Sequence, residues 1–533
     1  MNCYTAAIPE GSQFMTESNP RAARLEWLWM LSLVLIPALV LVFLRGVDAN
    51  WDLRNYHLYN PHAWLTGRML TDVAPAQLQT WHNPMLDVPL YLLAMSGLDA
   101  RWTTVWLTLP FAVAIWLLLR LQALLSPIAP TRMSQAVLAL LALTGAATYS
   151  TIGNSMNDGF VAAAILGALV LVLTPDTASH RRWFIAGLLA GGMMGLKLTA
   201  SAYCVALACT ALVSGPWRPR LTRIVALGLG GLLGFLGSYG YWGWRLFTLY
   251  GNPFFPYYND FFKSPALGLN DYADDRFRAE GFIDALRIPF ELLHKSVTHS
   301  ELYLKDPRLL MGLVGFIALA LLLRRQSSPT ALRNRTTMLA VFFVSAFFVW
   351  ALQYGIYRYA ATLELLGSLV LVLLLSQLPR GRTLAMITAT LLVTIATTRP
   401  NWGHVHYKSP MFGIQPAPVE NDAMVLIAGN EPIAFLALGI PRSVPMVAVT
   451  NSILRPEECS QMQLRAKHAI EAHSGTFWLL SEDGAAAARG EAILRNHYGM
   501  ERAGQCWDYP SSVMTARLCP QKRVAAIKAC PIP

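Results

Sequence analysis

Long hydrophobic segments recur along most of the chain and alternate with short polar stretches. A helix needs about 20 mostly apolar residues to cross a bilayer. Eleven segments approach or meet that requirement: 25–45, 101–124, 133–152, 157–174, 183–197, 199–213, 223–247, 308–324, 336–354, 360–378 and 383–398. The pattern therefore predicts a polytopic α-helical membrane protein with about 11 transmembrane helices.

Two of these eleven segments are short, and so is one further apolar stretch. Segments 183–197 and 199–213 are interpreted either as two short spans or as one span and a re-entrant helix. Residues 83–98 are too short to span, so we predict that they form a helix lying on the membrane surface.

The hydrophobic pattern changes at residue 399. Short apolar runs at 423–428, 444–449 and 476–480 are typical of buried strands, and the stretches 456–472 and 485–497 between and after them are typical of helices. This alternation predicts a small C-terminal α/β domain. The first strand is followed by Ile-Ala-Gly-Asn-Glu-Pro and lacks the G-x-G-x-x-G pattern of dinucleotide sites.

The chain is 54% hydrophobic and 14% charged, which is typical of a membrane protein. Its net charge of +11 does not indicate a nucleic-acid partner, because arginines concentrate in short gaps between apolar segments. Such gaps are cytoplasmic by the positive-inside rule. They hold Arg120, Arg132, Arg181, Arg182, Arg218, Arg220, Arg223, Arg324, Arg325, Arg333, Arg335, Arg380 and Arg382.

This asymmetry predicts the topology. The short junctions on the other side carry few cations beyond Lys197 and Arg358. Arg21 and Arg24 precede the first segment, which is too long for a signal-peptide core and lacks a convincing cleavage site. We therefore expect a multi-pass protein of a bacterial inner membrane with a cytoplasmic tail at 1–24.

The same topology divides the rest of the chain. A transmembrane domain covers 25–398, with large outer loops at 46–100 and 248–307, and an extracytoplasmic domain covers 399–533. Four of the seven cysteines lie in that last region: Cys459, Cys506, Cys519 and Cys530. Such clustering favours disulfides in an oxidising compartment, with three connectivities open.

The stretch Trp51-Asp-Leu-Arg-Asn-Tyr-His-Leu-Tyr-Asn60 directly follows the first segment. Membrane interfaces favour Trp and Tyr, but they do not require a carboxylate, amides and an imidazole as well. We interpret it as the rim of a site at the outer surface. The expected substrate-binding groups are Asn55, Tyr56, His57, Tyr59 and Asn60, joined by His82 and Asn83 from the same loop.

Two carboxylates are the candidate catalytic residues. Asp52 lies at the outer interface and could act as a general base; the alternative is an interface carboxylate paired with Arg54 or Arg68. Asp158 lies at another outer junction, where the alternative is that it or Asn157 caps the following helix.

Three isolated cations on the outer side could bind phosphate: Lys197, Arg245 and Arg358, the last followed by Tyr359. For each of them the alternative is interfacial anchoring. Glu364 could pair with one of these cations. His404 and His406 lack a further ligand set, so the sequence does not favour a zinc site.

These residues resemble the GT-C superfamily of membrane glycosyltransferases, which includes protein O-mannosyltransferases and the lipid A aminoarabinose transferase. Asp52 matches the acid of the first outer loop, and Asp158 is similar to a second polar position near the outer end of a later helix. The segment from His82 to Leu92 resembles the surface helix. Gly251-Asn-Pro-Phe-Phe-Pro256 and Tyr357-Arg-Tyr359 with Glu364 resemble motifs of uncharacterised bacterial members. The resemblance covers residues 25–398.

The resemblance implies a glycosyltransferase that moves a sugar from a polyprenyl-phosphate donor to a hydroxyl of a glycan, lipid or protein acceptor at the outer face. It implies inversion, with Asp52 as base and cations stabilising the leaving phosphate. The acidic pair frequent in the family is absent at Trp51-Asp52-Leu53, so a divalent metal is not favoured. The alternatives are a lipid-pyrophosphate-dependent oligosaccharide ligase or polymerase, and a secondary transporter.

Overall fold

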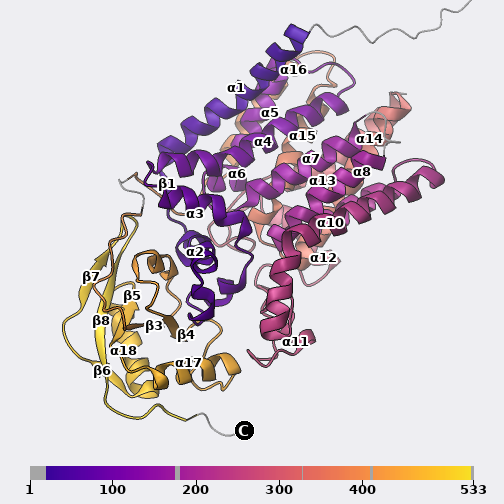
Figure 1. Cartoon of the computed structure of the whole chain (residues 1–533). Coiled ribbons are helices and arrows are strands. Elements are labelled where there is room, and N and C mark those ends of the chain that lie inside the picture. The colour runs from indigo at the N-terminus through magenta and orange to yellow at the C-terminus, as the bar shows by residue number, and fades with distance from the viewer. Residues whose placement is uncertain (1–19, 175–179, 327, 408–411, 530–533) are drawn as a thin grey trace, which may run out of the picture.

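The computed structural model describes residues 20–174, 180–326, 328–407 and 412–529, so most of the expected tail at 1–24 lies outside it. Most of the chain up to residue 396 folds into one bundle of helices (Figure 1). The bundle contains α1 (Pro20–Arg45), α4 (Arg101–Leu125), α5 (Arg132–Leu143), α6 (Ala146–Thr151), α7 (Asp158–Leu173), α8 (His180–Leu196), α9 (Ser201–Leu212), α10 (Trp217–Tyr250), α13 (Arg308–Arg325), α14 (Thr330–Gln353), α15 (Ala361–Leu375) and α16 (Arg382–Ala396).

Each of the eleven apolar segments contains at least one of these helices. Within the described ranges, five helical segments are long and apolar enough to cross a membrane: Leu28–Arg45, Arg101–Leu125, Trp217–Tyr250, Thr330–Gln353 and Tyr357–Leu375. The other apolar helices are shorter or less apolar, so the number of eleven crossings stays a prediction. Segments 183–197 and 199–213 form α8 and α9, separated by the short helix η5 (Leu198–Ala200).

The segment 133–152 is broken into α5 and α6 by a buried carboxylate. Glu364 of α15 accepts hydrogen bonds from the first amides of α6, at 2.7 Å from Ala147 N and 3.0 Å from Thr148 N. A Cβ on Gly145 would lie 2.0 Å from this carboxylate, so the close approach requires glycine. Glu364 is thus used to hold a helix start, which is favourable because the amides there are otherwise unpaired.

Glycines allow α8 and α10 to pack with their backbones in contact. A Cβ on Gly191 would lie 2.0 Å from the carbonyl oxygen of Gly231, and one on Gly234 would lie 2.3 Å from that of Leu188. Small residues are common at helix interfaces in membranes because they permit such an approach. This packing fixes the end of α8, after which Lys197 follows.

The loop at 46–100, which the sequence predicts to be outer and which is called the first outer loop below, begins with β1 (Val47–Asp48) and consists mainly of short helices. They are the π-helix η1 (Leu53–His57), α2 (Tyr59–Thr66), η2 (Arg68–Leu70), η3 (Gln77–Trp81), η4 (Met85–Asp87) and α3 (Val88–Met95). The surface helix expected at 83–98 corresponds to η4 and α3. In Figure 1, α2 lies between the bundle and the C-terminal sheet. The second outer loop contains α11 (Asn259–Phe262) and α12 (Phe282–Glu291).

The C-terminal region forms a mixed sheet with helices α17 (Gln461–Ala472) and α18 (Gly484–Tyr498). The strand order is β4-β3-β5-β8-β6, and β7 pairs with β8. Strands β3, β4 and β5 are mutually parallel where they pair, and β8 is antiparallel to β5. The bounds are β3 (Met424–Ala428), β4 (Met446–Thr450), β5 (Phe477–Ser481), β6 (Met500–Arg502), β7 (Trp507–Pro510) and β8 (Thr515–Arg523).

The three buried strands β3, β4 and β5 coincide with the apolar runs read from the sequence, whereas β6, β7 and β8 were not anticipated. Their residues alternate between exposed and buried without a continuous apolar run. The further short elements are η7 (Ala434–Gly439) and β2 (His404–Val405), which pairs with β1. Cys506 and Cys519 form a disulfide, and Cys459 is also disulfide-bonded. Cys530 lies outside the described residues.

The first outer loop is joined to the edge of this sheet. Val73 N donates to Met446 O at 2.9 Å, and Ala448 N donates to Val73 O at 2.9 Å, so the loop pairs with the open edge of β4. Buried Arg68 bonds Asp72 at 3.1 Å and the carbonyl of Val444 at 2.8 Å. The loop is therefore held on one side by the sheet and on the other by the bundle.

We expect Gly191→Ala to destabilise the protein, because the added methyl group meets the backbone of α10. Overpacking of this kind costs about 1–3 kcal/mol. The midpoint of thermal unfolding in detergent should fall by several degrees. Gly237→Ala in α10 is the matched control, since a Cβ there meets nothing within 4 Å and its midpoint should not fall. Equal midpoints for the two variants would contradict the packing argument.

Candidate functional site

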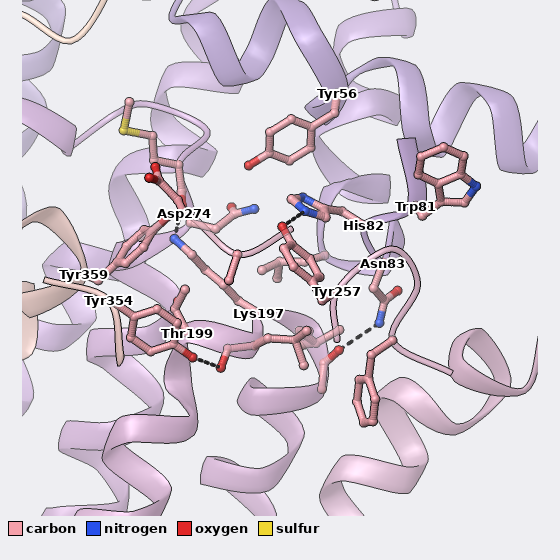
Figure 2. Close-up of a pocket in the computed structure, with 18 of the residues that line it drawn as sticks. Tyr56, Trp81, His82, Asn83, Lys197, Thr199, Tyr257, Asp274, Tyr354 and Tyr359 are labelled. Carbon is pink, nitrogen blue, oxygen red and sulfur yellow. Dashed lines mark hydrogen bonds between the residues drawn. The ribbon is translucent and has the colours of Figure 1, made fainter. Parts of the chain in front are cut away.

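A cavity of about 210 Å³ lies where the two outer loops meet the ends of several bundle helices. Its lining includes polar side chains, namely Tyr56, His57, His82, Asn83, Asp87, Lys197, Arg358 and Tyr359. It also includes apolar or aromatic side chains, namely Leu196, Leu198, Tyr239, Phe254, Phe255 and Tyr354. Figure 2 shows Lys197, His82 and Tyr257 pointing into the same space. Such a cavity suits a ligand with a polar head and an apolar tail.

Two cations of the cavity wall hold the carboxylates behind it. Lys197 forms an ion pair and a hydrogen bond with Asp158. Arg358 Nη1 lies 3.4 Å from Asp52 Oδ2 and 3.8 Å from Asp158 Oδ2, and its Nε lies 3.2 Å from Glu301. The side chains of Asp52 and Asp158 are only 12% and 3% exposed, so these ion pairs are shielded from water. The side chain of Glu301 is more exposed, at 31%.

The local backbone explains how these groups come together. Arg358 is on the short helix η6 (Tyr357–Ala360), between α14 and α15, and Lys197 follows α8. The ring of Tyr359 lies 5.1 Å from Lys197 Nζ and 4.7 Å from the guanidinium carbon of Arg358. An aromatic face favours nearby cations, so Tyr359 helps to hold both side chains at the cavity.

Asp158 begins α7, and Asn157 before it adopts a left-handed conformation with φ of 64°. The alternative that one of them caps the helix with its side chain is wrong for Asn157, which makes no capping hydrogen bond. Its side-chain amide donates instead to Asp87 Oδ1 at 2.8 Å. Asp87 also binds His57 Nδ1 at 2.8 Å. His57, Asp87 and Asn157 therefore form one hydrogen-bonded row in the cavity wall.

Asp87 and Asn157 were not assigned to the site from the sequence. Asp87 is the one carboxylate in the apolar segment 83–98, and a single carboxylate in such a segment is the sequence feature that could have indicated a site residue. Asn157 was considered only as a cap. Neither role is visible without the folded loop, because His57 and Asp87 are thirty residues apart and meet only in space.

His82 and Asn83 also line the cavity. His82 Nε2 lies 2.8 Å from the hydroxyl of Tyr257, which comes from the second outer loop. Burial lowers the pKa of His82 to about 4, so its ring is neutral at neutral pH. Asn83 donates to the carbonyls of Gly195 and Ser238 at 3.0 and 2.9 Å, and so ties the loop to α8 and α10.

Several expected site residues lie elsewhere. Asn55 and Asn60 are buried and bond the η3 region, with Asn55 reaching Ala76 O at 3.2 Å and Asn60 reaching Gln79 O at 2.8 Å. Tyr59 donates to Asp72 at 2.9 Å. These three residues stabilise the loop and do not line the cavity. Arg245 lines a second, smaller cavity with Tyr59 and Asp72, apart from the other two cations.

The catalytic candidates Asp52 and Asp158 do not line the cavity directly, and they contact it through Arg358 and Lys197. The alternative pairing of Asp52 with Arg54 or Arg68 is wrong. Arg54 pairs with Glu482 at 3.2 Å, Arg68 pairs with Asp72, and Asp52 pairs with Arg358. In the part of the chain that the structure describes, one group has metal-ligand spacing, Glu491 with Cys506 and Cys519. Its cysteines are joined to each other as a disulfide.

No family model and no curated protein matches the chain. Among solved structures, its fold is similar to that of the arabinofuranosyltransferase AftD from mycobacteria, with a TM-score of 0.50 and 13% sequence identity. The likeness covers 93% of this chain and 40% of that one, so the chain spans about two fifths of the length of its structural neighbour. At this identity the likeness shows a shared fold, and it agrees with the sequence resemblance to membrane glycosyltransferases.

The buried neutral state of His82 predicts a loss of stability in acid. Its pKa is lower in the folded protein, about 4, than in the unfolded chain, about 6.5. The contribution of His82 to the free energy of unfolding is at its full value above pH 6.5. It is lost as pH falls from 6.5 towards 4, because in this range the unfolded chain binds a proton that the folded protein does not. We expect the thermal midpoint of wild type to fall over this window, and that of His82→Gln to fall less. Parallel curves for the two proteins would contradict the assignment.

Proposed function

We propose that this chain is a membrane glycosyltransferase that moves a sugar from a polyprenyl-phosphate donor to an acceptor hydroxyl. The observation that carries the proposal is that the two cations Lys197 and Arg358 line one cavity together with several apolar and aromatic side chains. The shared fold with an arabinofuranosyltransferase supports the reaction class. The acceptor is a glycan, a lipid or a protein at the membrane surface.

Lys197 and Arg358 are the groups that we assign to the phosphate. Arg binds phosphate oxygens through a planar fork, and Lys meets them as a point charge. The apolar lining residues, among them Phe254 and Phe255, would contact the first isoprenoid units. Arg245, which was expected to join these cations, lines the other cavity, so we leave it out of the phosphate site.

The charge of the cluster explains how Asp52 could act as base. The four buried side chains Asp52, Asp158, Lys197 and Arg358 balance one another. An incoming phosphate therefore competes with Asp52 for Arg358. Donor binding would thus release Asp52 from Arg358, so that its carboxylate can turn towards the acceptor hydroxyl and take its proton, while Asp158 keeps Lys197 in place.

In the proposed reaction the acceptor oxygen attacks the anomeric carbon from the side opposite the phosphate. The new carbon–oxygen bond forms as the bond to the phosphate oxygen breaks, which inverts the anomeric carbon. The acceptor proton passes to Asp52, and the polyprenyl phosphate leaves with one more negative charge than the donor carried. Lys197 and Arg358 stabilise that added charge. The leaving phosphate needs no proton, because it is stable as an anion.

The arginine-rich gaps support the proposed orientation. They lie at helix ends opposite to those that line the cavity: one gap joins the end of α13 to the start of α14, whereas Gln353 at the end of α14 lines the cavity. By the positive-inside rule that side is cytoplasmic. The cavity and the C-terminal domain would then face the outside of a bacterial inner membrane.

Two other functions were considered from the sequence. A lipid-pyrophosphate-dependent ligase or polymerase would use the same cations with a more highly charged donor. A secondary transporter places its charged groups near the membrane midplane between repeated halves. The gathering of charges beside the outer loops favours an enzyme over a transporter.

The proposal is tested by reconstituting the protein with a panel of polyprenyl-phosphate and polyprenyl-pyrophosphate sugars and measuring released lipid phosphate. We expect release from a monophosphate donor. Arg358→Gln should lower kcat/KM by about 10²–10³-fold, as loss of one charge-stabilising donor typically does. Arg245→Gln is the matched control and should change it less than threefold, which is the ordinary scatter of such substitutions.

Release only from pyrophosphate donors would favour the ligase. No release from any donor by folded protein would contradict the proposed function. A larger loss in Arg245→Gln than in Arg358→Gln would place the phosphate in the second cavity.

A further inference from the structure

The row formed by His57, Asp87 and Asn157 has no part in the reaction described above. His57 and Asp87 are buried, with side chains 3% and 5% exposed, and both line the cavity. His57 Nδ1 lies 2.8 Å from Asp87 Oδ2, and Asp87 Oδ1 accepts from the amide of Asn157 at 2.8 Å. His57 is thus held from one side only.

These contacts fix which ring nitrogen carries the proton. The carboxylate of Asp87 accepts from Asn157, and its other oxygen accepts from the Nδ1–H of His57. In a neutral imidazole Nε2 then carries the lone pair.

The free nitrogen lacks a partner. His57 Nε2 is buried and makes no hydrogen bond within the described structure. Buried polar groups in native proteins are nearly always paired, and an exception next to a cavity points to a ligand. An acceptor nitrogen requires a donor from that ligand, and the donors that sugars provide are hydroxyl groups.

We propose that His57 Nε2 accepts a hydrogen bond from a substrate hydroxyl, with Asp87 and Asn157 as positioning residues that fix the ring. His57 would then select sugars that carry a hydroxyl at one position and reject the corresponding deoxy sugar. This inference rests on the proposed function. The hydroxyl can belong to the donor sugar or to the acceptor, since both present the same chemistry.

The first test compares each hydroxylated substrate with its single-deoxy counterpart, in separate donor and acceptor series. Wild type should prefer the hydroxylated compound at least tenfold in kcat/KM at one position, mainly through KM. His57→Phe should bring that ratio close to one, and His57→Gln, which retains an acceptor near Nε2, should restore part of it. His62→Phe is the matched control: His62 is buried in the same loop, its Nε2 is also unpaired, and it does not line the cavity.

The series in which the preference disappears identifies whether the donor or the acceptor carries the hydroxyl. An unchanged preference in His57→Phe would overturn the proposal. So would an equal fall in kcat for all substrates together with the loss of one limb of the pH–rate profile, since His57 would then be the base.

The second test does not depend on turnover. In ¹⁵N-histidine-labelled protein, with His57 assigned by its absence in His57→Gln, Nε2 should resonate as an unprotonated nitrogen. Its resonance should shift when a methyl glycoside is added at millimolar concentration and should not shift with the matching deoxy methyl glycoside. Asp87→Asn should weaken this response. A protonated Nε2 in the free protein, or equal shifts with both glycosides, would overturn the inference even if the donor panel had failed.

Discussion

The candidate site depends on the ion pairs that Arg358 forms with three carboxylates. One guanidinium reaches Asp52 from the first outer loop, Asp158 from the start of α7, and Glu301 from the second outer loop. Without Arg358, the buried carboxylates of Asp52 and Asp158 would lie near each other with only Lys197 to balance their negative charge. Such an unbalanced charge is costly in a site shielded from water. The same cation lines the cavity. It therefore links the substrate space to Asp52 and Asp158, which lie directly behind the lining residues.

This arrangement requires a rigid first outer loop. The loop is bound to the edge of β4 through Val73, to the C-terminal region through Arg68, and to α8 and α10 through Asn83. The C-terminal region thus contributes no described residue to the cavity lining and yet supports the loop that carries Asp52 and His57. The amides Asn55 and Asn60 stabilise this loop from within. The polar density of the motif at 51–60 is explained partly by folding and partly by the site.

The sequence predicted the features that follow from local pattern. Apolar segments located the bundle helices, the helix within 83–98 and the three central strands, because each of these elements carries its own continuous apolar signal. Pattern could not predict the break after Leu143, which depends on Glu364 more than two hundred residues away. It also missed the edge strands β6, β7 and β8, whose exposed residues dilute the apolar signal. For the site, rare charges in apolar surroundings correctly drew attention to Lys197 and Arg358. Arg245 carried the same signal, but only the packing shows that it lies in another cavity.

The central claim is that donor phosphate takes Arg358 from Asp52 and leaves Asp52 as the base. It is tested most directly by single-turnover transfer and donor binding in Asp52→Asn, compared with wild type. Removing the competing carboxylate should leave donor affinity unchanged or tighter, while the transfer rate falls by about 10²–10⁴-fold, as expected for loss of a general base. Full transfer activity in Asp52→Asn would contradict the account.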